Sequence, residues 1–179
     1  MKYDVEWLRG VPRWEAILFW GHRQKTAGTP DRSCCSQWFP AGFTVDGVHY
    51  STAEHWMMAG KARLFGDDET LAAILRAPDP ASAKQLGRRV RDFDAGRWRA
   101  HAYGHVRDGN VQKFRQNPRL REWLRGTAGK VLVEASPSDP IWGIGLSADD
   151  PRCADVATWQ GTNWLGFAIM EARDLLETA

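Results

Sequence analysis

The sequence predicts a mostly helical α+β domain of about six helices with a small β-sheet. Helix-compatible stretches fill residues 51–128, and a last amphipathic stretch closes the chain. Two short apolar runs, at residues 14–20 and 130–136, favour strands. The 179 residues are 43% hydrophobic and 26% charged, so we expect one packed domain over residues 1–179.

Three segments favour β-structure. The run "WEAILFW" at residues 14–20 is apolar with aromatic ends and predicts a buried strand, with a helix as the alternative. "KVLVEAS" at residues 130–136 has the clearest strand composition. Asp46 and Gly47 lie between two β-prone pieces, which is typical of a hairpin. We expect a single small sheet from the first two-fifths of the chain and residues 130–136.

Six helices are expected from their end signals and apolar spacing. Ser51 stands three residues before Glu54, the spacing of a capping box, and predicts a helix to about Leu64. Proline, glycine and aspartate residues separate the helices that follow, whose expected ranges are 67–77, 79–93, 94–117, 118–128 and 163–179. The last helix has a stripe of apolar residues that we expect to be buried: Leu165, Ile169, Ala172 and Leu176.

Composition narrows the class of protein. The net charge of +2 does not by itself argue for a nucleic-acid or membrane partner. There is no apolar run long enough for a membrane helix and no signal peptide, so a cytoplasmic location is expected. Three cysteines without disulfide spacing fit that compartment. Ten tryptophans supply core material and flat surfaces on which a heteroaromatic base can stack.

The predicted helix at residues 51–64 carries a candidate site. Glu54, Met58 and Lys61 lie at positions i, i+4 and i+7 and therefore share one face. The two charged residues are roughly 10 Å apart along the helix axis, so they can flank a small ligand. The alternative is that Glu54 completes a capping box while Lys61 is solvated.

A second candidate site lies in the long loop before the last helix. Gly161, Thr162 and Asn163 stand at the expected helix start, where free backbone N–H groups favour a phosphate or another anion. The alternative is a helix cap without a ligand. Asp139 lies close to Trp142, where desolvation suits an acid catalyst, although an aspartate before proline is also a common turn former.

Metal and nucleotide motifs are weak or absent. His101 and His105 are four residues apart on one predicted helix, which is compatible with zinc, but the central glutamate of a zinc-protease motif is missing. The sequence has no phosphate loop, no dinucleotide fingerprint and no nucleophile elbow. We therefore predict neither a metal nor a cofactor. Arginines at positions 88, 89, 91, 97 and 99 could contact phosphates or form a solvated helix face.

Four segments in a fixed order resemble the NADAR, or YbiA-like, family over roughly residues 15–177. They are "CSQWFPAGFTVDGVHYSTAEHWMMAGKARLF", "AKQLGRRVRDFDAGRW", "VQKFRQNPRLREWLRGTAGKVLVEASPSDPIWGIG" and "GTNWLGFAIMEAR". The resemblance implies a hydrolase of ribosyl N-glycosidic bonds. The implied substrates are a phosphorylated ribosylamino-pyrimidine intermediate of riboflavin biosynthesis, ADP-ribosylated guanine in nucleic acid, or both. A non-catalytic module that binds NAD or ADP-ribose is the alternative.

The resemblance also implies roles for individual residues. The catalytic set is Glu54, Lys61 and Asp139, with Glu54 as the electrostatic stabiliser or base and Asp139 as the second carboxyl group. The substrate-binding set is Trp38, His55, Arg88, Trp142, Gly143, Gly161, Thr162 and Asn163. Lys61 is expected either to act as a plain cation or to form a Schiff base with the opened sugar. The implied partner is the small nucleotide-like substrate or modified nucleic acid; no membrane is involved.

Overall fold

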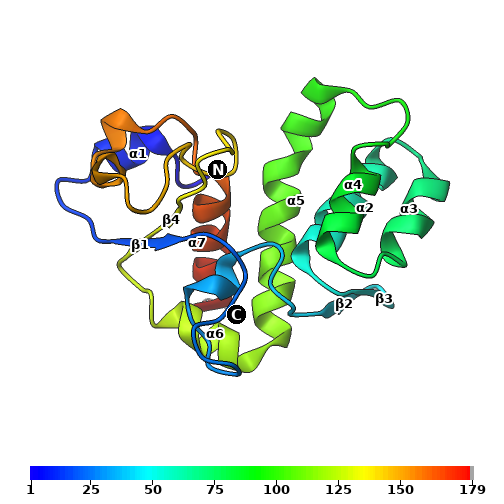
Figure 1. The fold of residues 1–179 in the computed structure, drawn as a ribbon, viewed down its shortest axis with the longest axis horizontal. Coiled ribbons are helices and arrows are strands. Elements are labelled where there is room, and N and C mark those ends of the chain that lie inside the picture. Colours follow the sequence, from blue (N-terminus) through cyan, green and yellow to red (C-terminus); the bar gives the residue numbers. More distant parts are fainter. Residues whose placement is uncertain (178–179) are drawn as a thin grey trace.

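The long helix α5 (Ala95–Gln116) lies at the centre of the fold, which a computed structural model describes over residues 1–177. Figure 1 shows helix α7 (Trp164–Glu177) along one side of α5 and helix α2 (Ala53–Leu64) on the other. Two further helices pack on α2, and they are α3 (Asp68–Leu75) and α4 (Pro80–Gly87). Helix α6 (Pro118–Arg125) follows α5 directly and contacts both long helices.

The strands form two separate pairs instead of the single sheet that the sequence predicted. Strand β1 (Ala16–Phe19) pairs in parallel with β4 (Val131–Glu134), and α7 packs against β4. Strands β2 (Phe43–Val45) and β3 (Val48–Tyr50) form the predicted hairpin, which lies beside α2 and α5 (Figure 1). The helix alternative for residues 14–20 was wrong, because these residues complete the backbone ladder of β4.

The mostly helical α+β class and the six predicted helices are confirmed. Within residues 1–177 there is one more helix, α1 (Val5–Arg9), which is too short to give a periodic signal. The predicted third helix ends at Gly87 instead of residue 93, and Asp92 then has a left-handed backbone (φ 51°). The predicted stripe on α7 is buried as expected. Residues 178–179 of the predicted last helix lie outside the described residues.

Helix α2 begins one residue later than predicted. Thr52 is the N-cap, with its Oγ1 accepting a hydrogen bond from the backbone N–H of His55. The predicted capping box between Ser51 and Glu54 was therefore wrong, because a different hydroxyl caps the helix. Glu54 is thereby released from the cap, and its side chain is only 4% exposed.

Two aromatic rings fix the crossing of α2 and α5. Trp56 and His105 stack with ring centroids 4.5 Å apart. Trp56 Nε1 donates to the His105 carbonyl at 2.8 Å, and His105 Nε2 lies 2.9 Å from the Trp56 carbonyl oxygen. The rings fit because each lies over a glycine of the facing helix: a Cβ at Gly60 would lie 1.9 Å from the His105 ring, and one at Gly109 2.3 Å from the Trp56 ring. Larger residues at either glycine would force the helices apart.

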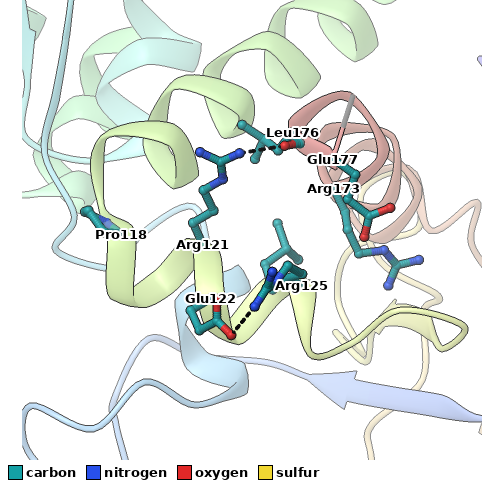
Figure 2. Close-up of a pocket in the computed structure, with 8 residues that line it drawn as sticks. Pro118, Arg121, Glu122, Arg125, Arg173, Leu176 and Glu177 are labelled. Carbon is teal, nitrogen blue, oxygen red and sulfur yellow. Dashed lines mark hydrogen bonds and ion pairs between the residues drawn. The ribbon is translucent and has the colours of Figure 1, made fainter. Parts of the chain in front are cut away.

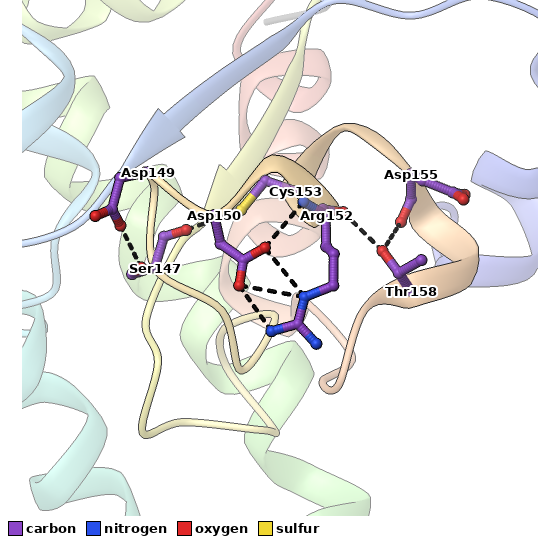
Figure 3. A network of polar contacts seen from close by, with 7 residues as sticks. All are labelled: Ser147, Asp149, Asp150, Arg152, Cys153, Asp155 and Thr158. Atoms are coloured by element: carbon purple, nitrogen blue, oxygen red, sulfur yellow. Dashed lines mark hydrogen bonds and ion pairs between the residues drawn. The ribbon is translucent and has the colours of Figure 1, made fainter.

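The long segment between β4 and α7 is folded by its own polar contacts. Figure 3 shows the part around two 3₁₀ turns, η2 (Pro151–Ala154) and η3 (Val156–Thr158). Asp150 pairs with Arg152, and the Thr158 hydroxyl donates to the backbone oxygens of Arg152 and Asp155. Within residues 1–177, no helix is long and apolar enough to cross a membrane.

Asn163 joins this segment to the strand β4. Its Oδ1 accepts from the backbone N–H of Glu134 at 2.9 Å, and its Nδ2 donates to the Leu132 carbonyl at 2.9 Å. The residue is fully buried and has a left-handed backbone with φ 53°. Asparagine tolerates this conformation better than most residues, so both its backbone and its side chain suit the position.

We predict that Asn163→Ala lowers the free energy of unfolding by about 2–5 kcal/mol, because two buried backbone groups lose their partners and alanine disfavours the left-handed backbone. Urea denaturation followed by tryptophan fluorescence measures the change. Asn163→Gly, which keeps the backbone conformation and loses only the hydrogen bonds, should fall between alanine and wild type. An Asn163→Ala protein within about 0.5 kcal/mol of wild type would contradict this role for the side chain.

Candidate active site

A cavity of about 250 Å³ lies where the α2–α4 side of the fold meets the β4–α7 side. Its walls come from six parts of the chain. One side is formed by the segment Ser36–Trp38, by Glu54, Met57 and Met58 of α2, and by Lys84 of α4. The other side is formed by Glu134 at the end of β4, by Asp139, Ile141 and Trp142 of the following loop, and by Leu165 of α7. Three carboxyl groups and one ammonium group therefore share one small cavity.

Glu54 reaches this cavity from the first turn of α2. Burial raises the pKa of its carboxyl to about 7, while Lys84 and a hydrogen bond from the Trp38 side chain act in the opposite direction. Its backbone N–H donates to the Gln37 carbonyl at 3.0 Å, which ties the helix start to the cavity wall. Glu54 thus lies in a small cavity with a carboxyl group whose pKa is raised by burial.

Glu134 and Lys84 are cavity residues that were not among the predicted site residues. Burial raises the pKa of Glu134 to about 8, and the negative charges of Asp139 and Glu54 add to the effect. Its Oε2 is buried and has no hydrogen-bond partner among the described residues. The Lys84 ammonium lies 5.9 Å from the centre of the Trp38 ring. Both residues occur inside the segments that carried the family resemblance, so that resemblance could have indicated them.

Asp139 and Trp142 are brought to the cavity as expected, and the loop geometry shows how. Asp139 Oδ1 accepts from the backbone N–H groups of Ile141 and Trp142 at 3.0 and 2.8 Å, which folds the loop back on itself. Trp142 packs edge-on against Trp164 with ring centroids 5.7 Å apart. One carboxylate oxygen of Asp139 is therefore used to hold the indole of Trp142 at the cavity wall.

The start of α7 does not offer the free N–H groups that the sequence suggested. The backbone N–H groups of residues 162–165 donate to the carbonyls of residues 140–143 at 3.0–3.2 Å. The expectation of an open anion site at this helix start was wrong, since loop carbonyls occupy the donors. The Thr162 hydroxyl donates to the Ile141 carbonyl, and a Cβ at Gly161 would lie 2.4 Å from the Gly143 carbonyl oxygen.

Gly143 and Gly161 therefore serve the packing of the loop. Gly143 is similarly crowded, with the Glu134 carbonyl oxygen 2.9 Å from the position of a Cβ. Together with Thr162 and Asn163, these glycines lie outside the set of cavity-lining residues. They hold the loop that carries Asp139 and Trp142 against β4.

Three other predicted site residues lie outside the cavity lining. The Lys61 ammonium donates to the Gly87 carbonyl at 2.8 Å and lies 3.9 Å from the centre of the Phe93 ring. The buried His55 ring contacts the Thr52 hydroxyl at 2.8 Å and the Ala77 carbonyl at 3.1 Å. Arg88 is exposed at the end of α4, and its charge lowers the pKa of Glu54. His55 thus joins α2 to the turn between α3 and α4, and Lys61 joins α2 to α4.

The two histidines considered for zinc have other contacts. His105 is stacked on Trp56, and its Nε2 lies 2.9 Å from the Trp56 carbonyl oxygen. His101 Nδ1 lies 2.8 Å from the Arg97 carbonyl oxygen. Over residues 1–177, no group of three or more potential ligands among histidine, cysteine, aspartate and glutamate is arranged to hold a metal ion.

A larger hollow of about 530 Å³ lies elsewhere, between α6 and α7 (Figure 2). Its charged groups contact the protein itself: Arg125 pairs with Glu122, and Arg121 donates to the Leu176 carbonyl at 2.7 Å. Arg173 donates to the Thr127 carbonyl at 2.6 Å and so joins α7 to the turn before β4. The smaller cavity, with its desolvated carboxyl groups, is the stronger candidate for an active site.

Comparison with known proteins assigns the class. The NADAR domain model matches residues 18–177, so the chain belongs to the NADAR domain family, and the resemblance seen in the sequence is confirmed. It is 41% identical over 163 residues to an N-glycosidase of Acanthamoeba polyphaga mimivirus, covering 88% of this chain and 94% of that relative.

Two comparisons with YbiA agree with this assignment. The chain is 31% identical over 132 residues to the N-glycosidase YbiA of Escherichia coli strain K12, covering 74% of each chain. The NMR structure of the E. coli protein YbiA superposes with a TM-score of 0.72 at 28% identity, covering 94% of this chain and 88% of that one. The predicted YbiA-like fold is therefore confirmed.

The raised pKa values of Glu54 and Glu134 predict a pH-dependent cost in stability. A carboxyl group whose pKa is higher in the folded than in the unfolded state favours folding below its unfolded pKa, and this contribution is lost as pH rises through the folded value. Glu54→Gln and Glu134→Gln should therefore unfold several degrees above wild type at pH 9 and close to it at pH 4, as measured by thermal denaturation. Glu122→Gln on exposed α6 is the matched control; equal behaviour of all three variants would contradict the burial of these charges.

Proposed function

We propose that this protein hydrolyses the N-glycosidic bond between a ribose and a heteroaromatic base or its amino group, and that the cavity around Glu54 is the active site. The observation that carries the proposal is the gathering of Glu54, Glu134 and Lys84 in one desolvated cavity with tryptophan walls. The relatives named N-glycosidases support the reaction class.

The chemistry of the reaction fits two carboxyl groups in different protonation states. Breaking a ribosyl C–N bond builds positive charge on the sugar, which a carboxylate facing the ring stabilises, while an acid protonates the departing nitrogen. Glu54, whose carboxylate form Lys84 and Trp38 favour, takes the first role. Glu134 has the higher pKa and takes the role of acid, with the charge of Asp139 helping it to keep its proton.

Lys84 takes the Schiff-base role, one of the two that were expected of Lys61, because Lys84 lines the cavity and Lys61 does not. A ribosylamine can open to an iminium form, and an amine can attack its C1 carbon, expel the base and leave a lysine imine that water then hydrolyses. The attacking amine must first lose a proton. The Glu54 carboxylate, with a pKa of about 7, accepts that proton more readily than an ordinary carboxylate does.

The size and walls of the cavity support the proposed substrate class. About 250 Å³ is small for a ligand pocket and suits a ribose with its base better than an entire dinucleotide. Trp38 and Trp142 supply aromatic surfaces for the base. Arg88 takes the role of the phosphate contact outside the cavity in this proposal; its exposure at the end of α4 and its effect on the pKa of Glu54 support that role.

The proposal predicts turnover of a phosphorylated ribosylamino-pyrimidine or of ADP-ribosylated guanosine, with release of the free base or its amine. Chromatography of the products after incubation with each compound measures it. Glu54→Gln should lower kcat by about 10²–10⁴-fold, the usual contribution of such a group, with an unchanged circular dichroism spectrum. Tight binding of ADP-ribose or NAD without release of base from either compound would instead identify a binding module.

Borohydride trapping separates the two lysines. We expect reduction during turnover to attach the sugar covalently to the peptide that contains Lys84, as read by mass spectrometry of the digested protein. Lys84→Met should abolish the adduct, whereas Lys61→Met, the matched control, should retain it wherever the variant folds. An adduct that persists in Lys84→Met would contradict the assignment.

A further inference from the structure

Gln37 lines the cavity next to Trp38 and has an amide group that is only half satisfied. The residue is 8% exposed. Its Nε2 donates to Asn110 Oδ1 at 3.3 Å, while its Oε1 is buried and has no hydrogen-bond partner among the described residues. A buried carbonyl oxygen without a partner costs about 1–3 kcal/mol, so its persistence in a residue that lines the cavity calls for an explanation.

The orientation of this amide is fixed by a short chain of hydrogen bonds. Asn110 lies on α5 and donates through Nδ2 to the Val106 carbonyl at 2.9 Å. A carbonyl can only accept, so the NH₂ group of Asn110 must face Val106 and its Oδ1 must face Gln37. The NH₂ group of Gln37 therefore faces Asn110, and the unpartnered atom is an oxygen, which can only accept a hydrogen bond.

The backbone that carries Gln37 is held on both sides. The fully buried Lys113, three residues after Asn110 on α5, donates to the Ser36 carbonyl at 2.8 Å. The Gln37 carbonyl accepts from the backbone N–H of Glu54. The Gln37 side chain is thus held in one orientation beside the start of α2, the helix that carries Glu54.

We propose that Gln37 Oε1 is a recognition group that accepts a hydrogen bond from the N-riboside substrate, an inference that rests on the proposed function of the cavity. The donor is an N–H of the base or a hydroxyl of the ribose. A substrate that lacks this donor would leave the oxygen buried without a partner, and such sites discriminate strongly against it. Gln37 selects the substrate, and Asn110 positions Gln37.

The test compares the N-riboside that wild type hydrolyses with two analogues, one lacking the ribose 2-hydroxyl and one methylated on the base N–H. Wild type should lose about ten- to a hundredfold in kcat/KM on the analogue without the donor that Gln37 accepts. In Gln37→Met that ratio should fall to near one, because the acceptor is gone. The analogue that shows the effect distinguishes a sugar donor from a base donor.

Control variants keep the result interpretable. Gln37→Met leaves Asn110 Oδ1 buried without its donor, so the double variant Gln37→Met/Asn110→Leu, which replaces both amides by apolar groups, provides a second folded test. Gln112→Met makes the same change on α5, outside the cavity lining, and should behave as wild type. If either Gln37 variant keeps the wild-type discrimination against both analogues, the inference is overturned while the proposed function stands. If wild type hydrolyses no N-riboside, both are overturned.

Discussion

The structure around the cavity depends on the attachment of the 140–163 segment to β4 through Asn163. That side chain bonds to the backbone on either side of Val133, while four N–H groups at the start of α7 donate to carbonyls of the 140–143 loop. These contacts place Glu134, Asp139 and Trp142 on one rigid support. Helices α2 and α4 supply Glu54 and Lys84 from the opposite side of the cavity, so the site forms only when the two sides of the fold are packed together.

This arrangement buries carboxyl groups close together, which lowers stability when they are charged but suits catalysis. Burial raises the pKa of both Glu54 and Glu134, the negative charge of Glu54 adds to the effect at Glu134, and Lys84 offsets only part of the rise. Because Glu54 and Glu134 interact, their protons belong to the pair, and the cavity can hold one carboxylate and one carboxylic acid near neutral pH. Such a pair fits a reaction that needs a stabilising negative charge and a proton donor at the same time.

Much of the fold, but only part of the candidate site, could be predicted from the sequence. Apolar spacing and end signals located six helices, whereas α1 was missed because five residues do not show a period. Glu54, Trp38, Asp139 and Trp142 were placed together by family resemblance, and the structure brings them to one cavity. The sequence indicated Lys61 and not Lys84, because helical spacing relates residues within one helix and gives no information about the neighbouring helix α4. Likewise, the occupied N–H groups of α7 depend on tertiary contacts with a loop 20 residues earlier.

The most direct test of the account is an NMR titration of the protein labelled with ¹³C at the glutamate side-chain carboxyl groups. If Glu54 and Glu134 share the desolvated cavity, two carboxyl resonances should titrate above about pH 6, unlike exposed glutamates near pH 4.3. Glu54→Gln and Glu134→Gln should each remove one of these resonances and lower the apparent pKa of the other, because the loss of one negative charge relieves its neighbour. Titration of every glutamate below pH 5 would contradict the proposed proton-sharing cavity.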